Sequence, residues 1–252
     1  MNTANNSIKI VCPFYNATDF IETSIMSSIK QKYSNFKIIL INDCSTDTSD
    51  EKIKWIIDKY SEFIVYIKNE QRMGAMYNHQ YAVFEYCKPE DIIVQMDGDD
   101  MFPNNGCLEY INSFYNTNKC MMMYGQATYA SGRQGVARPY VSREEFDNKR
   151  NLDFYVSHIR TFRAEAFFEI KKQDPELSCF KDANLQWYQM SCDVAMMYPV
   201  MEVCGYDNVK YNSKSLYIYN DSNPISDVKL DMRYQYAVHQ EILKKKPFKK
   251  AF

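Results

Sequence analysis

The sequence predicts an α/β protein in which a mainly parallel central sheet is flanked by helices. Three observations lead to this fold class. Strand and helix signals alternate over the first hundred residues, the strand segments are apolar along most of their length, and the helical segments between them carry apolar residues on one face. Strands that are apolar on both faces are typical of parallel sheets covered by helices.

Each element of the first hundred residues follows from a local pattern. Apolar runs predict strands over 8–14, 36–41, 63–67 and 92–96. Helices are predicted between them, because apolar residues recur three or four positions apart at Ile21, Ile25 and Ile29, and again at Ile53, Ile56 and Ile57. A third helix is expected from Gly74 to about Tyr86. In such sheets ligands bind at the carboxyl ends of the strands.

The pattern after residue 105 is less regular. The predicted elements are a helix over 105–116, a strand over 120–129, a basic loop over 131–139, helices near 162–171 and 188–198, short strands near 208–219, a break over 219–224 and a last helix over about 229–244. A chain of 252 residues is long enough for one sizeable domain, so a single domain over 1–252 is expected.

Composition and charge narrow the possible partners. The formal net charge of −2 argues against a nucleic-acid binder, for which a basic field is expected. No apolar run approaches the roughly 18–20 residues of a membrane span. The basic C-terminal segment 244–250 is interpreted as a solvated tail, with peripheral contact to an anionic membrane as the alternative.

The eight cysteines indicate a compartment. None forms a Cys-x-x-Cys pair, no Cys/His spacing resembles a zinc site, and no signal-peptide pattern precedes them. We therefore interpret them as reduced thiols in a cytoplasmic protein.

Three acids stand where the fourth predicted strand ends, in Asp97-Gly98-Asp99-Asp100. Negative charge gathered at one point is costly unless a cation neutralises it. Mg²⁺ and Mn²⁺ prefer oxygen ligands and often bind phosphorylated substrates. Asp97 and Asp99 are alternate residues that can reach one ion, whereas Asp100 is expected to point elsewhere and make structural hydrogen bonds. A polar turn that caps the following helix is the alternative reading.

Two further polar loops follow strands at the same predicted edge. Pro13-Phe14-Tyr15-Asn16 ends the first strand, and Asn42-Asp43-Cys44-Ser45 follows the second. Each alone is an ordinary turn, but together with the acids they converge on one cleft. There Asp43 can accept a hydrogen bond from a nucleobase edge, and Tyr15 can pack near the base or ribose.

In these motifs residues 8–102 resemble the N-terminal half of glycosyltransferase family 2, enzymes of GT-A fold that transfer sugars with inversion. The resemblance rests on four motifs in order, which are Val11-Cys-Pro-Phe-Tyr-Asn16, Ile39-Leu-Ile-Asn-Asp-Cys-Ser-Thr-Asp47, Asn69-Glu-Gln-Arg-Met-Gly74 and Asp97-Gly-Asp-Asp100. Asn42 departs from the more common Asp-Asp pair. Beyond residue 130 the resemblance is thinner.

The resemblance implies a GT-A fold with a nucleotide-binding half (1–102), an acceptor-side half (103–228) and a C-terminal helix with a basic tail (229–252). It implies a UDP-sugar donor, with Mn²⁺ or Mg²⁺ held by Asp97 and above all Asp99. The implied donor-binding residues are Pro13, Phe14, Tyr15, Asn16, Asp43, Arg72, Gly74, Asp97 and Gly98. The acceptor is expected to be a glycan, a lipid-linked sugar or a protein hydroxyl.

Inverting transfer also needs a base, and the family places this acid on a helix of its second half. Asp193 in Ser191-Cys192-Asp193 is the nearest counterpart, although the family's preceding Glu is Cys192 here. Asp182 is the second choice, and a surface Asp is the structural alternative. His158 is expected either to contact the acceptor or a donor phosphate, or to be structural. Arg133 and Arg138 are predicted either to close over a phosphate or to be solvated.

Two other functions compete with transfer. Gly98-Asp99-Asp100 also resembles the GDD of viral RNA polymerases, but a further upstream acidic motif, a larger chain and a basic template channel are missing. The stronger alternative is a catalytically silent nucleotide-sugar or glycan binder on the same fold, because the motif around Asp193 matches imperfectly.

Overall fold

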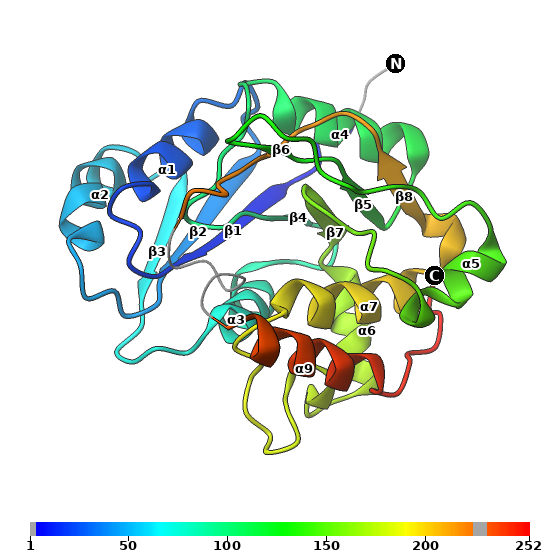
Figure 1. The fold of residues 1–252 in the computed structure, drawn as a ribbon. Coiled ribbons are helices and arrows are strands. Elements are labelled where there is room, and N and C mark those ends of the chain that lie inside the picture. The colour runs from blue at the N-terminus through cyan, green and yellow to red at the C-terminus, as the bar shows by residue number, and fades with distance from the viewer. Residues whose placement is uncertain (1–3, 224–230) are drawn as a thin grey trace.

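The structure is a computed structural model that describes residues 4–223 and 231–252, and it has the predicted α/β architecture (Figure 1). Seven strands form the central sheet in the order β3-β2-β1-β4-β7-β5-β8. They are β1 (Ile8–Phe14), β2 (Phe36–Asn42), β3 (Ile64–Lys68), β4 (Ile92–Gln95), β5 (Met122–Gly125), β7 (Arg160–Arg163) and β8 (Val209–Asn212). A separate two-stranded sheet joins β6 (Thr128–Tyr129) to β9 (Ile218–Tyr219).

The central sheet is mostly parallel. Strands β1 to β4 run in parallel, and only β7 is antiparallel to its neighbours β4 and β5. Phe14 at the end of β1 lies beside Asn42 at the end of β2, and Val11 lies beside Gln95 at the end of β4. The loops that follow these strands therefore leave the sheet at one edge, as predicted.

Helices cover both faces of the sheet (Figure 1). One layer holds α1 (Ile21–Ile29), α2 (Ser49–Lys59) and α4 (Cys107–Asn118), and the other holds α3 (Ala75–Tyr86), α6 (Glu165–Gln173), α7 (Cys192–Cys204) and α9 (Met232–Leu243). Strand β1 serves both layers, because Ile8 and Ile10 pack into the first core and Val11 into the second. Helix α7 is buried on all sides from Val194 to Cys204.

The second half departs from the prediction in four places. A continuous strand over 120–129 is wrong, since β5 ends at Gly125 and β6 pairs in the other sheet. The predicted helix over 162–171 begins later, at Glu165, because 160–163 form the inserted strand β7. The helix predicted over 188–198 corresponds to α7, which runs from Cys192 to Cys204. The residue before it, Ser191, has a left-handed backbone conformation (φ 54°). The short helix α5 (Arg143–Asp147) was not predicted.

The last predicted helix corresponds to α9, while its expected first residues, 229 and 230, and Pro224 of the expected break lie outside the described residues. Residues 244, 246, 247, 249 and 250 are exposed, as expected of a solvated tail, but the segment after α9 is also anchored to the protein at two points. The Phe248 amide donates to Glu202 Oε2 (3.0 Å), and the Ala251 amide donates to the Val203 carbonyl (2.8 Å).

Within 4–223 and 231–252, no helix combines the length and apolar character needed to cross a membrane.

Candidate active site

A cleft of about 420 Å³ opens at the sheet edge where β1 and β4 end. The first half of the chain contributes the loops after these strands and the start of α3. The second half contributes 157–160, the start of α7, β6 and β9. The cleft therefore lies where both halves meet, as ligand sites in α/β sheets commonly do.

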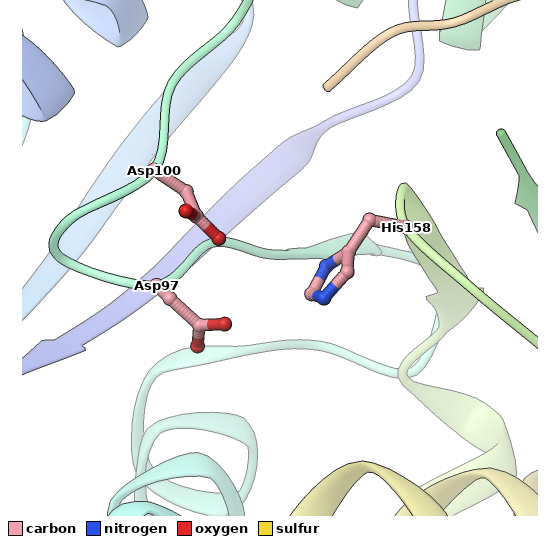
Figure 2. Close-up of side chains that lie close together, drawn as sticks. All are labelled: Asp97, Asp100 and His158. Atoms are coloured by element: carbon pink, nitrogen blue, oxygen red, sulfur yellow. The ribbon is translucent and has the colours of Figure 1, made fainter. Parts of the chain in front are cut away.

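Asp97, Asp100 and His158 converge in this region (Figure 2). Each offers one ligand atom, and these atoms all lie within 4.8 Å of one another. The two acids lie on the loop after β4, and His158 comes from the segment that leads into β7. The insertion of β7 beside β4 brings the histidine to the acids, although some sixty residues separate them in sequence.

The environment of Asp100 disfavours an isolated carboxylate. Its Oδ1 accepts a hydrogen bond from the Asn220 amide (2.6 Å), as expected of a structural acid. Its buried Oδ2 has no hydrogen bond of ordinary geometry within the described part of the chain. Burial, and next the charges of Asp97 and Asp99, raise the pKa of Asp100. A cation bound at this point would offset both the cost of burying the carboxylate and its repulsion by Asp97 and Asp99.

His158 is held as a neutral ring. Its imidazole stacks on Tyr217, with ring centroids 4.3 Å apart, and burial followed by the charge of Arg160 lowers the pKa of His158. Its buried Nδ1 has no hydrogen-bond partner among the described residues. Two carboxylates and a neutral imidazole with an available lone pair are a donor set that suits Mn²⁺, so the residues fit a divalent cation.

Asp99 lies beside this group but is not part of it. Its side chain lines the cleft, and its Oδ2 accepts a hydrogen bond from Asn223 Nδ2 (2.6 Å). Burial raises the pKa of Asp99, although the bond from Asn223 opposes this effect. The structure thus places Asp97 of the predicted metal pair in the cluster, together with Asp100 and His158, whereas Asp99 contacts the segment after β9.

Tyr15 and Arg72 form one wall of the cleft. The Arg72 guanidinium lies 3.8 Å from the centroid of the Tyr15 ring, and 56% of the Arg72 side chain is exposed. Pro13, Phe14 and Gly98 line the same region. A stacked planar cation on an aromatic ring gives a surface on which a nucleobase or a phosphate can bind.

Three predicted donor-binding residues, Asn16, Asp43 and Gly74, do not line the cleft and instead tie its loops together. Asn16 Oδ1 accepts from the Thr46 amide (2.8 Å). The Asp43 carboxylate, 4% exposed, accepts from Asn69 Nδ2 and from the amides of Met73 and Gly74 at 2.8–2.9 Å. Gly74 has a φ of 86°, which favours glycine there.

Asp193 also lines the cleft, in the first turn of α7. Its Oδ2 accepts a hydrogen bond from Arg160 Nη2 (2.7 Å), and 36% of the Asp193 side chain is exposed. Asp182, the second candidate, does not line the cleft. Its Oδ1 accepts from the amides of Asn184 and Gln186 and so closes a local turn.

Sequence patterns gave no role to several residues that line the cleft, among them His79, Gln95, Arg160 and Tyr219. Gln95 had a signal, because it is a polar residue at the end of an otherwise apolar strand. His79 and Arg160 lie on different elements, so their proximity depends on the fold.

Arg133 and Arg138 do not line the cleft. Arg133 stacks on Tyr129 (4.0 Å), and Arg138 pairs with Glu145 (2.5 Å).

Sequence relatives support one family. The family model of glycosyl transferase family 2 matches residues 9–171. The teichoic acid poly(glycerol phosphate) polymerase of Staphylococcus epidermidis is 26% identical over 151 residues, which are 60% of this chain and 20% of the relative. An uncharacterized glycosyltransferase of Haemophilus influenzae is 32% identical over 123 residues, 48% of this chain and 47% of the relative. The chain thus spans a fifth to about half of these relatives.

Solved structures share the fold. S. aureus TarS 1–349 in complex with UDP-GlcNAc has a TM-score of 0.66 at 17% identity, covering 94% of this chain and 65% of that one. Mannosyltransferase PcManGT from Pyrobaculum calidifontis, in complex with GDP-Man and Mn²⁺, has a TM-score of 0.61 at 13% identity, covering 98% and 68%. At such identities the likeness concerns the fold alone. With the family match covering most of its length, the chain has the GT-A fold and belongs to glycosyltransferase family 2.

Proposed function

We propose that this protein is a metal-dependent inverting glycosyltransferase that moves a sugar from a UDP-sugar to a hydroxyl acceptor. The observation that carries the proposal is one cleft lined by the stacked Tyr15 and Arg72, by Asp97 and His158 of the Asp97–Asp100–His158 cluster, and by Asp193. These features supply a nucleotide surface, a cation site and a proton acceptor in one cleft. The complex of TarS with UDP-GlcNAc supports a uridine nucleotide as donor.

The cation in this proposal is Mn²⁺ or Mg²⁺. Asp97, Asp100 and His158 are the ligands that the geometry supports best, with Asp99 as the alternative ligand that the D-x-D spacing predicts. Mn²⁺ in the solved complexes of PcManGT and GalNAc-T7 supports that ion. A bound cation would supply positive charge to the diphosphate of the departing nucleotide.

In the nucleotide half of the site, some residues contact the donor and others hold the surrounding loops in place. Tyr15 and Arg72 bind the base or diphosphate, beside Pro13, Phe14 and Gly98. Asp43 stays our candidate for contact with the base edge, and its bonds to the turn before α3 also fix the position of Arg72. Asn16 and Gly74 shape the loops around it.

The chemical step is a single displacement at the anomeric carbon. Asp193 accepts the proton of the acceptor hydroxyl as that oxygen forms a bond to the carbon, while the bond to the diphosphate oxygen breaks and UDP leaves with the electron pair. Attack from the face opposite the leaving group inverts the configuration. In this proposal most contacts to the leaving group come from the first half of the chain, with His158 added from the second half, which also supplies Asp193 as the proton acceptor.

The acceptor belongs to one of three classes, a glycan, a lipid-linked sugar or a protein hydroxyl. The teichoic acid poly(glycerol phosphate) polymerase among the relatives favours an acceptor of the glycan class. All eight cysteines carry free thiols, which favours a reducing compartment such as the cytoplasm.

A donor screen tests the proposal. The melting temperature of the purified full chain is measured with UDP, UDP-GlcNAc, UDP-glucose and GDP-mannose, each with Mn²⁺ or EDTA, and release of the nucleoside diphosphate is followed in parallel. We expect uridine nucleotides with Mn²⁺ to raise the melting temperature and one UDP-sugar to release UDP, because ligands of the native state stabilise it. If no uridine nucleotide shifts the melting temperature, the donor site is wrong. Binding without turnover of any donor would instead support the silent binder.

A further inference from the structure

We propose that Arg160 is a positioning residue for Asp193, which it holds in the orientation that receives the proton of the acceptor. The inference rests on the proposed function, since that function assigns the proton to Asp193. It goes beyond the sequence motifs, which give Arg160 no role and do not link it to α7.

Arg160 is placed to act as a fixed support. It is the first residue of β7, is 7% exposed, and lies beside Tyr124 of β5 in the central sheet. Its Nη2 donates to Asp193 Oδ2 (2.7 Å), and its Nε donates to the Val156 carbonyl (3.3 Å). The guanidinium is thus tied to backbone on one side and to the carboxylate on the other.

Asp193 needs such a support because its own element leaves it partly exposed. It lies at the start of α7, where Ser191 adopts a left-handed φ of 54°, and 36% of its side chain is exposed. Its Oδ1 accepts from the Val194 amide (2.8 Å), so Arg160 is the contact that fixes the second oxygen. A planar guanidinium sets the direction of a carboxylate better than a flexible ammonium does.

The geometry separates Arg160 from the other arginine of the cleft. The Arg72 side chain is 56% exposed and lies 4.0 Å from Asp43, so it can move to meet a diphosphate. The Arg160 side chain is 9% exposed and already paired. We therefore propose that Arg72 binds the charged diphosphate of the substrate and that Arg160 orients the Asp193 carboxylate.

The test is the steady-state release of UDP from UDP-GlcNAc by the full chain with Mn²⁺, with water as acceptor. The variants are Arg160→Gln, Arg160→Lys, Asp193→Asn and the double variant Arg160→Gln/Asp193→Asn. Arg163→Gln is the matched control, because Arg163 lies on the same strand and donates to the Glu90 carbonyl outside the cleft. Melting temperature and UDP affinity confirm that each variant is folded.

We expect Arg160→Gln to lower kcat about 100-fold, the cost of a catalytic group misplaced by about an ångström, with little change in KM. Arg160→Lys should recover part of this loss. In the Asp193→Asn background, Arg160→Gln should have no further effect on kcat, because a positioning residue acts through its partner. Arg163→Gln should leave kcat unchanged.

Three results would overturn the inference, and a fourth would overturn the proposed function on which it rests. Losses that multiply in the double variant, or a rise in KM with unchanged kcat, would show that Arg160 acts on the substrate instead. If Arg160→Gln does not fold, Arg160→Lys decides, and an unchanged kcat in that variant refutes positioning. A wild-type kcat in Asp193→Asn would show that Asp193 is not the base. Failure of the proposed function is therefore distinguishable from failure of this inference.

Discussion

His79 shows at the scale of one residue how the cleft is built. It lies on α3 and lines the cleft, yet it is only 4% exposed. Burial, and next the charge of Arg160, lower the pKa of His79 to about 3. The imidazole is therefore neutral at physiological pH, and it offers hydrogen bonds to a ligand without adding charge.

The same pKa shift predicts a loss of stability in acid. Below about pH 6.5 the unfolded chain binds a proton at His79 that the folded chain does not bind until about pH 3, so the free energy of unfolding falls as pH falls between these values. From pH 7 to pH 5 this group should remove about 2 kcal/mol. Urea denaturation with EDTA present should show that His79→Gln loses about 2 kcal/mol less than wild type over this interval.

His239→Gln is the control for this prediction. His239 lies on α9 and is half-buried, and its pKa is lowered by burial, although Asp193 opposes the shift. This variant should keep most of the wild-type pH dependence. Equal pH dependence in His79→Gln and wild type would contradict the assignment of a buried, neutral His79.

Gly98 separates the acids of the motif for a steric reason. A Cβ atom at this position would lie 2.4 Å from Phe14 Cβ, closer than real Cβ atoms approach other atoms. We expect Gly98→Ala to displace the loop that carries Asp97 and Asp99, to lower the free energy of unfolding by about 1–3 kcal/mol and to weaken UDP binding. Urea denaturation and UDP titration measure the two effects.

Gly106→Ala is the matched control. A Cβ there would meet only Asn104 Oδ1, at 3.4 Å, which is ordinary contact. This variant should change the free energy of unfolding by less than about 1 kcal/mol and leave UDP binding unchanged. If Gly98→Ala behaves like Gly106→Ala, close packing of the motif on β1 is not required.

At the scale of elements, a buried ion pair joins the turn at 149–151 to α7, and its carboxylate also binds the C-terminal segment. Arg150 binds Glu202 through Nε (2.6 Å) and Nη2 (3.1 Å), and Glu202 also accepts from the Phe248 amide. The side chains are 12% and 4% exposed. Because α7 carries Asp193 at its other end, this pair anchors the helix that presents the proposed base.

We expect Arg150→Met to destabilise the protein by about 3 kcal/mol, since it leaves the Glu202 carboxylate buried without its partner. Lys172→Met removes the exposed pair with Glu169, in which 77% of the lysine side chain is accessible, and should cost less than about 1 kcal/mol. Denaturant midpoints give both values. Similar losses in the two variants would show that the Arg150 pair is no more important than a surface contact.

The elements of the first half could be predicted because each strand is apolar along most of its length and each helix carries apolar residues at helical spacing. The break between β5 and β6 could not be predicted, since the residues on both sides of it are apolar. The two strands lie in different sheets because of their pairing with strands distant in sequence. The same limit applies to the site. Asp97 stands beside its strand in sequence, whereas His158 and Arg160 reach the cleft only because β7 is inserted between β4 and β5.

At the scale of the molecule, two helical layers flank one sheet (Figure 1), and most of the residues to which we assign a function line the cleft at the edge where β1 and β4 end. The acids of the first half meet a histidine, an arginine and Asp193 of the second half across this edge. In the proposed function, most contacts to the leaving group come from the first half of the chain, and the base that activates the acceptor comes from the second half.

The dependence of UDP release on Mn²⁺ tests this account most directly. Release of UDP from UDP-GlcNAc is measured across a Mn²⁺ titration for wild type, for Asp97→Asn, and for Asp182→Asn, which alters an acid outside the cleft. We predict saturable activation by Mn²⁺ in wild type and Asp182→Asn, abolished by EDTA, and a loss of at least about 100-fold in Asp97→Asn. Release at the wild-type rate in Asp97→Asn, or a rate indifferent to Mn²⁺ and EDTA, would contradict it.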